Sequence, residues 1–184
     1  MSLKTQLIRH RKNFDKCNLC EGCQTRHKVY FRFKGKSIKY LMIGEAPGNT
    51  EVVTKQPFTG RAGRKVLDKW IAASKISNFA ITNTILCFPS ERGGSSKFRQ
   101  PTLEERQNCR PRLDEFVEIV EAQYYIALGS VAKQSPPTGV TYSLVLDHPA
   151  AVLYEAVGGQ YDKTPKFKRN LIKLTNFVRE TQNG

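Results

Sequence analysis

The stretch KYLMIGEAPG, from Lys39 to Gly48, joins a short apolar run to a loop rich in glycine and proline. An apolar run of this length that stops at a glycine favours a buried strand over Lys39–Ile43. Beyond the loop, apolar residues recur at helical spacing, which predicts a helix over residues 61–74. The stretch therefore predicts the first strand of a sheet, with a helix after it.

Three further apolar runs predict strands at Phe79–Thr82, Tyr124–Leu128 and Ser143–Leu146. A capping-box spacing and helical periodicity predict two more helices, over residues 102–120 and 165–179. Strands that alternate with helices indicate a parallel sheet. We therefore expect an α/β fold, a three-layer α/β/α domain around a central, mainly parallel four-stranded sheet.

The chain has 184 residues, and no repeat or linker divides it, so residues 1–184 are predicted to form one domain. The Cys-bearing segment 1–38 is expected to hold a helix and a cysteine-rich loop packed on that domain. No apolar run approaches the roughly 20 residues of a membrane helix, and no apolar segment follows the basic N-terminus. We therefore expect neither a membrane span nor secretion.

The charge of the chain is strongly positive. There are 30 Lys and Arg residues against 16 Asp and Glu residues, for a net charge of +14. Such a surface favours polyanionic partners, either nucleic acid or an anionic membrane surface. A basic protein without a polyanionic partner is the alternative that charge alone leaves open.

Unusual polar residues follow three of the predicted strands. Glu45 lies in the GEAPG loop, Asn83 follows the second strand, and His148 follows the fourth. Ligands bind at the carboxyl ends of the strands in open α/β sheets, so these three residues are predicted to gather at one edge. Each one alone has an ordinary alternative: a strand-to-loop turn, a turn-forming asparagine or a structural histidine.

Five cysteines occur along the chain: Cys17, Cys20, Cys23, Cys87 and Cys109. Their odd number and the lack of an export signal disfavour a disulfide framework and favour metal or redox chemistry. A Cys-x-x-Cys pair with two distant cysteines is compatible with zinc as well as with an iron–sulfur cluster. The spacing alone does not separate the two metals.

Four short motifs stand in order along the chain: GEAPG at 44–48, PFTGRAG at 57–63, NTILC at 83–87 and HPA at 148–150. In this order they resemble the uracil-DNA glycosylase superfamily, and most closely its iron–sulfur branch, family 4. The resemblance covers about residues 14–155. It implies a DNA repair enzyme that hydrolyses the N-glycosidic bond of uracil in single- or double-stranded DNA and leaves an abasic site.

The resemblance also implies a cytoplasmic, DNA-associated protein, which we expect to be a monomer. Two other functions stay open at this point. One is a catalytically silent, glycosylase-like protein that only binds DNA. The other is a glycosylase for another deaminated or modified base.

The same resemblance implies roles for the strand-end residues. Phe58 would stack on a uracil flipped out of the DNA, since aromatic platforms bind bases. The amide of Asn83 would pair with O4 and N3–H of uracil, a pattern that cytosine does not match. His148, with backbone N–H groups near Ala46, would stabilise the negative charge that develops on the departing uracil.

Two carboxylates complete the predicted site. Glu45 would orient the attacking water or contact uracil through its backbone, and Glu51 would crowd the C5 edge of the ring. Because Ala46 stands where other uracil glycosylases place a water-positioning aspartate, we expect a dissociative route with late capture of water. After the HPA motif, Val152 or Leu153 would act as a wedge in the minor groove; a core turn is the alternative.

For the cysteines, the resemblance implies a [4Fe–4S] cluster, with zinc as the alternative cofactor. The expected ligands are Cys17, Cys20, Cys87 and Cys109. Cys23 is surplus to this pattern, either as a free thiol or as a replacement for Cys20. The expected role of the cluster is to attach the N-terminal segment and the 88–108 region to the sheet.

Overall fold

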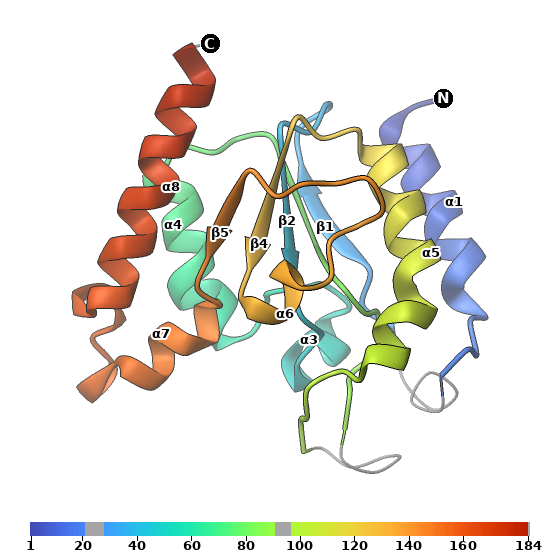
Figure 1. Ribbon diagram of the computed structural model, residues 1–184, viewed down its shortest axis with the longest axis horizontal. Coiled ribbons are helices and arrows are strands. Elements are labelled where there is room, and N and C mark those ends of the chain that lie inside the picture. The colour runs from blue at the N-terminus through green and yellow to red at the C-terminus, as the bar shows by residue number, and fades with distance from the viewer. Residues whose placement is uncertain (21–27, 91–96, 184) are drawn as a thin grey trace.

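The computed structural model describes residues 1–20, 28–90 and 97–183 of the chain. Its centre is a five-stranded sheet in the order β1-β3-β2-β4-β5 (Figure 1). The strands are β1 Phe31–Lys34, β2 Tyr40–Gly44, β3 Phe79–Asn83, β4 Tyr124–Leu128 and β5 Leu144–Leu146. Strands β2 to β5 pair in parallel, whereas β1 is antiparallel to β3. The predicted α/β fold with a mainly parallel sheet is confirmed.

The sheet has one strand more than the four predicted. Strand β1, with the sequence FRFK, lies inside the segment 1–38 that was assigned to a helix and a loop. It is only four residues long and pairs along one side, with Phe31 opposite Thr82 of β3. Such a short edge strand carries too few alternating positions to be distinguished from a loop by its pattern.

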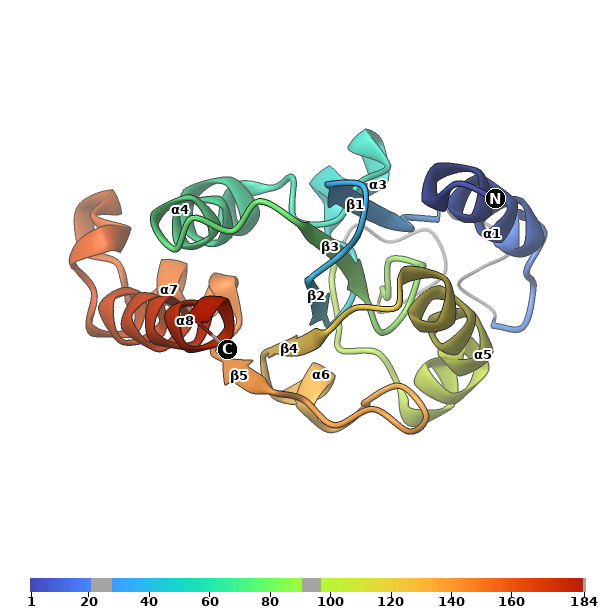
Figure 2. The same cartoon turned by 90° about the horizontal axis from the view of Figure 1, so that it is seen from above.

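Helices cover both faces of the sheet, as Figure 2 shows from above. On one face lie α1 (Leu3–Asp15) and α5 (Leu103–Val120). On the other face lie α4 (Asp68–Ala73) and α8 (Pro165–Asn183). No helix in the described part of the chain has the length and apolar character needed to cross a membrane.

The alternation of side chains along β2 explains the three layers. Leu41 and Ile43 point to the cluster formed with α1 and α5, which includes Phe116. Tyr40 and Met42 pack on the opposite side with residues of α4 and α8. Because successive residues of a strand face opposite sides, a strand with no polar residue is buried by helices on both faces.

Shorter elements fill the connections near the carboxyl ends of the strands. They are α3 Asn49–Thr54, a π-helical turn at Gly63–Leu67, α6 Ser130–Lys133, α7 Pro149–Glu155 and 3₁₀ turns at Val157–Gly159 and Tyr161–Lys163. The helix predicted over residues 61–74 is thus a π-helical turn that continues into α4. The loop expected before Gly60 contains α3.

Candidate active site

A pocket of about 470 Å³ opens at the carboxyl edge of the sheet, and we call it the strand-end pocket. Its volume falls within the range of small-molecule sites. All six residues predicted to bind substrate line it: Glu45, Ala46, Glu51, Phe58, Asn83 and His148. The structure therefore brings together residues that are up to 103 positions apart in the sequence.

Asn83 is the last residue of β3, and its side chain is 2% exposed. Its Oδ1 atom is buried and has no hydrogen-bond partner among the described residues. In the sheet, Asn83 pairs with Gly44 of β2, where an added Cβ would lie 2.5 Å from Asn83 Oδ1 and 2.6 Å from the Phe58 ring. Only a glycine at position 44 leaves room for both side chains beside the pocket.

Phe58 forms one wall of the strand-end pocket. It is 6% exposed, and its ring centroid lies 5.6 Å from that of His148. Its φ of 55° lies in the left-handed region, which is strained for a bulky residue. A Cβ on Gly63 would lie 1.7 Å from the Phe58 carbonyl oxygen, so the following helical turn packs directly on this backbone. The strained conformation is therefore held by close packing.

His148 is the N-cap of α7, and this position fixes its tautomer. Its Nδ1 atom accepts a hydrogen bond from the Ala150 backbone N–H at 3.2 Å. The proton of the neutral ring is therefore on Nε2, which is left as a donor. Burial lowers the pKa of His148 to about 4, so the ring is neutral at neutral pH.

Glu45 follows β2 directly, and its side chain is half-buried. Its Oε1 atom is buried without a hydrogen-bond partner in the described part of the chain, and burial raises the pKa of this carboxyl. Its backbone carbonyl accepts from Thr84 Oγ1 at 2.5 Å and from the Ile85 N–H at 3.4 Å. The loops after β2 and β3 are thereby joined beside the pocket.

Glu51 has a contact that the sequence did not suggest. Its Oε2 atom accepts from the Gly48 N–H at 3.1 Å, and its Oε1 atom accepts from the Gly60 N–H at 2.9 Å. One carboxylate thus ties the GEAPG loop to the loop that carries Phe58. The residue lines the pocket as expected, but its oxygens are directed to backbone amides.

The prediction of Val152 as a wedge is wrong. Helix α7 begins at Pro149 and turns Val152 into the core, where it is 0% exposed. Leu153 packs partly buried against the same core cluster. The next residue, Tyr154, lines the strand-end pocket and is 89% exposed. A helix that begins within the HPA motif was not expected, and it accounts for this difference.

Three of the predicted metal ligands meet at a second site. Cys20, Cys87 and Cys109 line one small cavity, which we call the cysteine cavity. Cys17 is not among the residues that line it, and Cys23 lies outside the described residues. In the described ranges, no three His, Cys, Asp or Glu side chains are arranged to hold a single metal ion.

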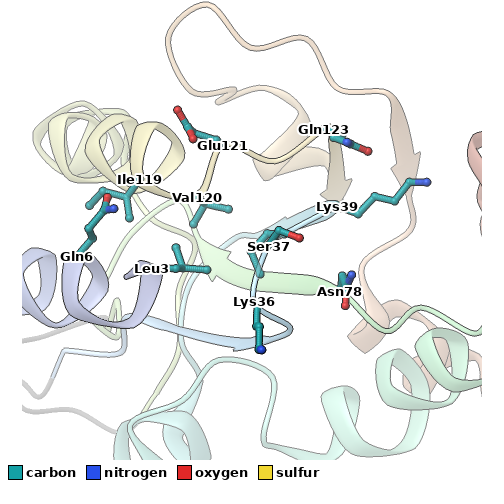
Figure 3. Close-up of a pocket in the computed structure, with 11 residues that line it drawn as sticks. Leu3, Gln6, Lys36, Ser37, Lys39, Asn78, Ile119, Val120, Glu121 and Gln123 are labelled. Carbon is teal, nitrogen blue, oxygen red and sulfur yellow. The ribbon is translucent and has the colours of Figure 1, made fainter. Parts of the chain in front are cut away.

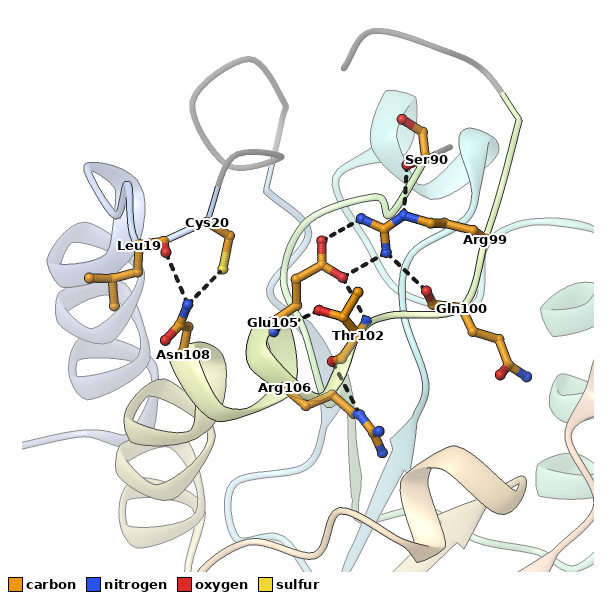
Figure 4. Close-up of polar contacts among 9 residues, drawn as sticks. All are labelled: Leu19, Cys20, Ser90, Arg99, Gln100, Thr102, Glu105, Arg106 and Asn108. Atoms are coloured by element: carbon orange, nitrogen blue, oxygen red, sulfur yellow. Dashed lines mark hydrogen bonds and ion pairs between the residues drawn. The ribbon is translucent and has the colours of Figure 1, made fainter. Parts of the chain in front are cut away.

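Polar contacts hold the segments around the cysteine cavity, as Figure 4 shows. The Asn108 side chain donates to the Leu19 carbonyl at 3.0 Å and to Cys20 Sγ at 3.7 Å. The Leu86 N–H donates to Cys109 Sγ at 3.4 Å. Helix α5 therefore connects the segment after α1 with the segment after β3.

A third hollow, shown in Figure 3, lies at the opposite edge of the sheet. Lys39, Asn78 and Gln123, which line it, precede β2, β3 and β4 in the sequence. None of the predicted site residues lines it. The residues predicted to bind substrate thus line the strand-end pocket at the carboxyl edge and not this hollow.

The fold and the site define an α/β protein whose strand-end pocket, with one aromatic wall and inward polar groups, suits a small planar ligand. The chain belongs to the uracil DNA glycosylase superfamily, whose family profile matches residues 31–175.

Several relatives bear the name type-4 uracil-DNA glycosylase. The one from Archaeoglobus fulgidus is 27% identical over 163 residues, which cover 75% of this chain and 78% of the relative. The one from Pyrobaculum aerophilum is 28% identical over 180 residues, which cover 83% and 86%. The one from Thermotoga maritima is 31% identical over 119 residues, which cover 64% and 58%.

Proposed function

We propose that this protein is a uracil-DNA glycosylase of the type-4 kind, which hydrolyses the N-glycosidic bond of uracil in DNA and leaves an abasic site. Its superfamily and the names of its relatives support this proposal. The observation that carries it is that Asn83, a residue lining the strand-end pocket, has a buried Oδ1 atom without a hydrogen-bond partner among the described residues. A buried acceptor without a partner is costly unless a ligand satisfies it.

Uracil offers one donor and one acceptor that match the amide of Asn83. The Oδ1 atom accepts from N3–H, and the Nδ2 group donates to O4. Cytosine has an unprotonated N3 and an amino group at these positions, so both contacts are lost. Sites that leave buried polar groups unpaired discriminate strongly. The Phe58 ring would contribute a stacking surface for the flipped base.

His148 would act on the departing base. As the glycosidic bond breaks, negative charge develops on O2 and N1 of uracil, and donors aimed at this charge lower the barrier. The neutral ring has its proton on Nε2, because Nδ1 accepts from the Ala150 N–H. A neutral donor of this kind stabilises the anion without a prior protonation step, and backbone N–H groups near Ala46 would assist it.

Glu45 would orient the water that captures the sugar. Its half-buried carboxylate lines the pocket, and burial raises its pKa, which makes it a better proton acceptor. The Ala46 position has no carboxylate. A dissociative route therefore follows, in which an oxocarbenium-like sugar forms first and water attacks late.

The test is release of uracil from DNA. The protein is incubated with a uracil-containing oligonucleotide, and abasic sites are cleaved with alkali. We expect cleavage by the wild type and at least a 100-fold slower single-turnover rate for Asn83→Ala. Asn78→Ala is the matched control, because Asn78 precedes β3 at the opposite edge.

Two results would overturn the proposal. One is a folded wild-type protein that binds DNA but releases no uracil from single- or double-stranded substrates, which would select a silent DNA-binding protein. The other is an Asn83→Ala variant with the wild-type rate. Parallel substrates with hypoxanthine or thymine mismatches identify a glycosylase for another base.

We further propose that the cysteine cavity holds a [4Fe–4S] cluster. Iron–sulfur clusters are bound by cysteine thiolates, and Cys20, Cys87 and Cys109 surround one cavity. A cluster is several atoms wide, so its thiolates do not need to converge on one point as zinc ligands do. The resemblance of the ordered motifs to the iron–sulfur branch of the superfamily supports iron over zinc.

The fourth ligand in this proposal is Cys17, and Cys23 is surplus to the ligand set. Anaerobically purified protein is expected to be brown and to contain iron and sulfide in equal amounts. Cys17→Ser and Cys23→Ser are compared for iron content, and the variant that loses iron identifies the ligand. Colourless, zinc-loaded and fully active protein would refute the cluster.

A further inference from the structure

A buried arginine lies behind the strand-end pocket and takes no part in the proposed chemistry. Arg112, on α5, is only 1% exposed. Its Nη1 group donates to Thr82 Oγ1 at 3.0 Å, and its Nη2 group donates to the carbonyls of Asn83 at 2.7 Å and Thr84 at 3.1 Å. In the described part of the chain, no carboxylate is among its hydrogen-bond partners.

This placement is costly for an arginine. A buried guanidinium is usually paired with a carboxylate, because desolvation of an unpaired charge is unfavourable. Here the compensation comes from neutral oxygens only, and Nε has no partner among the described residues. Three of the five N–H donors of the guanidinium bind one short segment, which is the end of β3 and the turn that follows it.

The segment that Arg112 binds is the one that carries Asn83 into the pocket. The turn is also bound from its other side, because the Thr84 N–H donates to the Gly44 carbonyl at 2.9 Å and Thr84 Oγ1 donates to the Glu45 carbonyl. The turn is thus fixed between α5 and the GEAPG loop. Rotation of its peptides would shift the Asn83 amide relative to Phe58.

The amide of Asn83 has little tolerance for such a shift. It must present one donor and one acceptor in the plane of a base that the Phe58 ring stacks on. Hydrogen bonds weaken steeply with poor alignment, and a misplacement of about 1 Å can cost about 100-fold in rate. A charged donor gives stronger hydrogen bonds to the carbonyls than a neutral side chain would.

We propose that Arg112 is a positioning residue for Asn83. Its guanidinium holds the carbonyls of Asn83 and Thr84 so that the Asn83 amide meets the base edge in the strand-end pocket. The inference rests on the proposed uracil excision. It assigns to helix α5 a role in base selection, although no residue of α5 belongs to the four sequence motifs.

The experiment is a double-mutant cycle on single-turnover uracil excision. Arg112→Met is made in the wild type and in Asn83→Ala, and the fold of each variant is checked by circular dichroism. Arg110→Met is the matched control, because Arg110 lies on the same helix and donates to the Pro136 carbonyl, away from the pocket. Arg112→Lys keeps the charge.

We expect Arg112→Met to slow excision about 100-fold in the wild type but less than about threefold in Asn83→Ala, because the group it positions is then absent. Arg112→Lys should recover part of the rate, and Arg110→Met should stay within about twofold of the wild type, a typical effect for a site outside such networks. Equal losses in both backgrounds would show a general structural role and overturn the proposal, as would an unchanged rate. If Arg112→Met does not fold, Arg112→Lys takes its place in the cycle.

A second readout separates this inference from the proposed function. If the wild type releases no uracil, the proposed function has failed, and amide hydrogen exchange then tests the positioning alone. The Thr84 and Ile85 amides, which donate to the Gly44 and Glu45 carbonyls, should exchange at least tenfold faster in Arg112→Lys than in Arg110→Met. Equal protection in the two variants would overturn the inference.

Discussion

The strand-end pocket and the cysteine cavity are built on the same short segment, since Asn83 and Cys87 are four residues apart. The two sites differ in whether their polar atoms have hydrogen-bond partners. In the pocket, Asn83 Oδ1 and Glu45 Oε1 are buried without partners among the described residues. In the cavity, Cys20 and Cys109 accept hydrogen bonds, and Cys87 and Cys109 belong to a hydrophobic cluster.

This difference separates a site for a passing ligand from a site that holds the fold together. Buried polar atoms without partners, on residues that line a pocket, are available to a ligand. Packed sulfur atoms that link three chain segments contribute to stability in any state of the reaction. Substitutions in the pocket should therefore change the rate more than the stability, and substitutions in the cavity should do the reverse.

The largest expected effect is that of His148→Asn. Asparagine is also a good N-cap, so α7 keeps its cap while the ring donor is lost. We expect single-turnover uracil excision to fall about 10²–10³-fold, as for other lost donors to a developing anion. The melting temperature should change little. Excision kinetics and thermal denaturation of the same preparation check both parts.

His10→Asn is the matched control for this prediction. His10 is 1% exposed, lies in α1 and contacts Glu115 at 3.1 Å. We expect this variant to lose stability while its folded molecules keep the wild-type rate. A His148→Asn variant that loses stability but keeps its rate would reverse the contrast between the two regions.

Gly44→Ala tests whether the pocket depends on close packing at the end of β2. The added methyl group would meet Asn83 Oδ1 and the Phe58 ring at 2.5 and 2.6 Å. We expect a loss of about 100-fold in rate, since a shift of about 1 Å in a positioned group has this effect. Overpacking should also cost about 1–3 kcal/mol of unfolding free energy.

Gly139→Ala provides the comparison for Gly44→Ala. A Cβ at this position meets nothing within 4 Å, but the φ of +72° is unfavourable for alanine. The expected loss is about 1–2 kcal/mol of unfolding free energy with no change in rate. Equal rates for the two alanine variants would exclude a role of Gly44 in shaping the pocket.

Cys109→Ser tests the other side of the comparison. Cys109 is a ligand in the proposed cluster, and loss of a metal ligand is among the most destabilising single changes, so we expect the melting temperature to fall by about 10 °C or more. Iron should be lost with it. The folded fraction, quantified by active-site titration with uracil-containing DNA, should still discriminate uracil from cytosine, because Asn83 is unchanged. A stable Cys109→Ser variant that no longer discriminates uracil from cytosine would contradict the assignment of roles.

The gathering of Glu45, Asn83 and His148 was predictable because a single geometric rule places the ends of parallel strands at one edge. The short strand β1 was not, since four residues at an edge leave almost no pattern. The two contacts of Glu51 and the three of Arg112 depend on loop conformations and on the rotation of α5. No local sequence rule contains this information.

The smallest expected effect concerns Glu105, which lines the cysteine cavity and whose polar contacts Figure 4 shows. Its carboxylate accepts from both Nη groups of Arg99, at 2.8 and 2.7 Å, and from the Thr102 N–H at 2.8 Å. The hydrogen bonds from Arg99 are the main reason why its pKa is lowered. Glu105→Gln should cost about 1 kcal/mol of unfolding free energy at pH 7, because the pair is partly exposed.

The pH dependence of this small loss identifies its cause. A carboxyl group whose pKa is lower in the folded protein stabilises the fold above its ordinary pKa of 4.5, and this stabilisation disappears as the pH falls through the lowered value. In urea titrations the difference in stability between the wild type and Glu105→Gln should therefore shrink below pH 4.5 and vanish once the pH is below the lowered pKa. If the difference in unfolding free energy between the two proteins stays the same at acidic pH, the loss is caused by altered packing against the cysteine cavity. The rate of uracil excision should stay the same in both proteins, because Glu105 does not line the strand-end pocket.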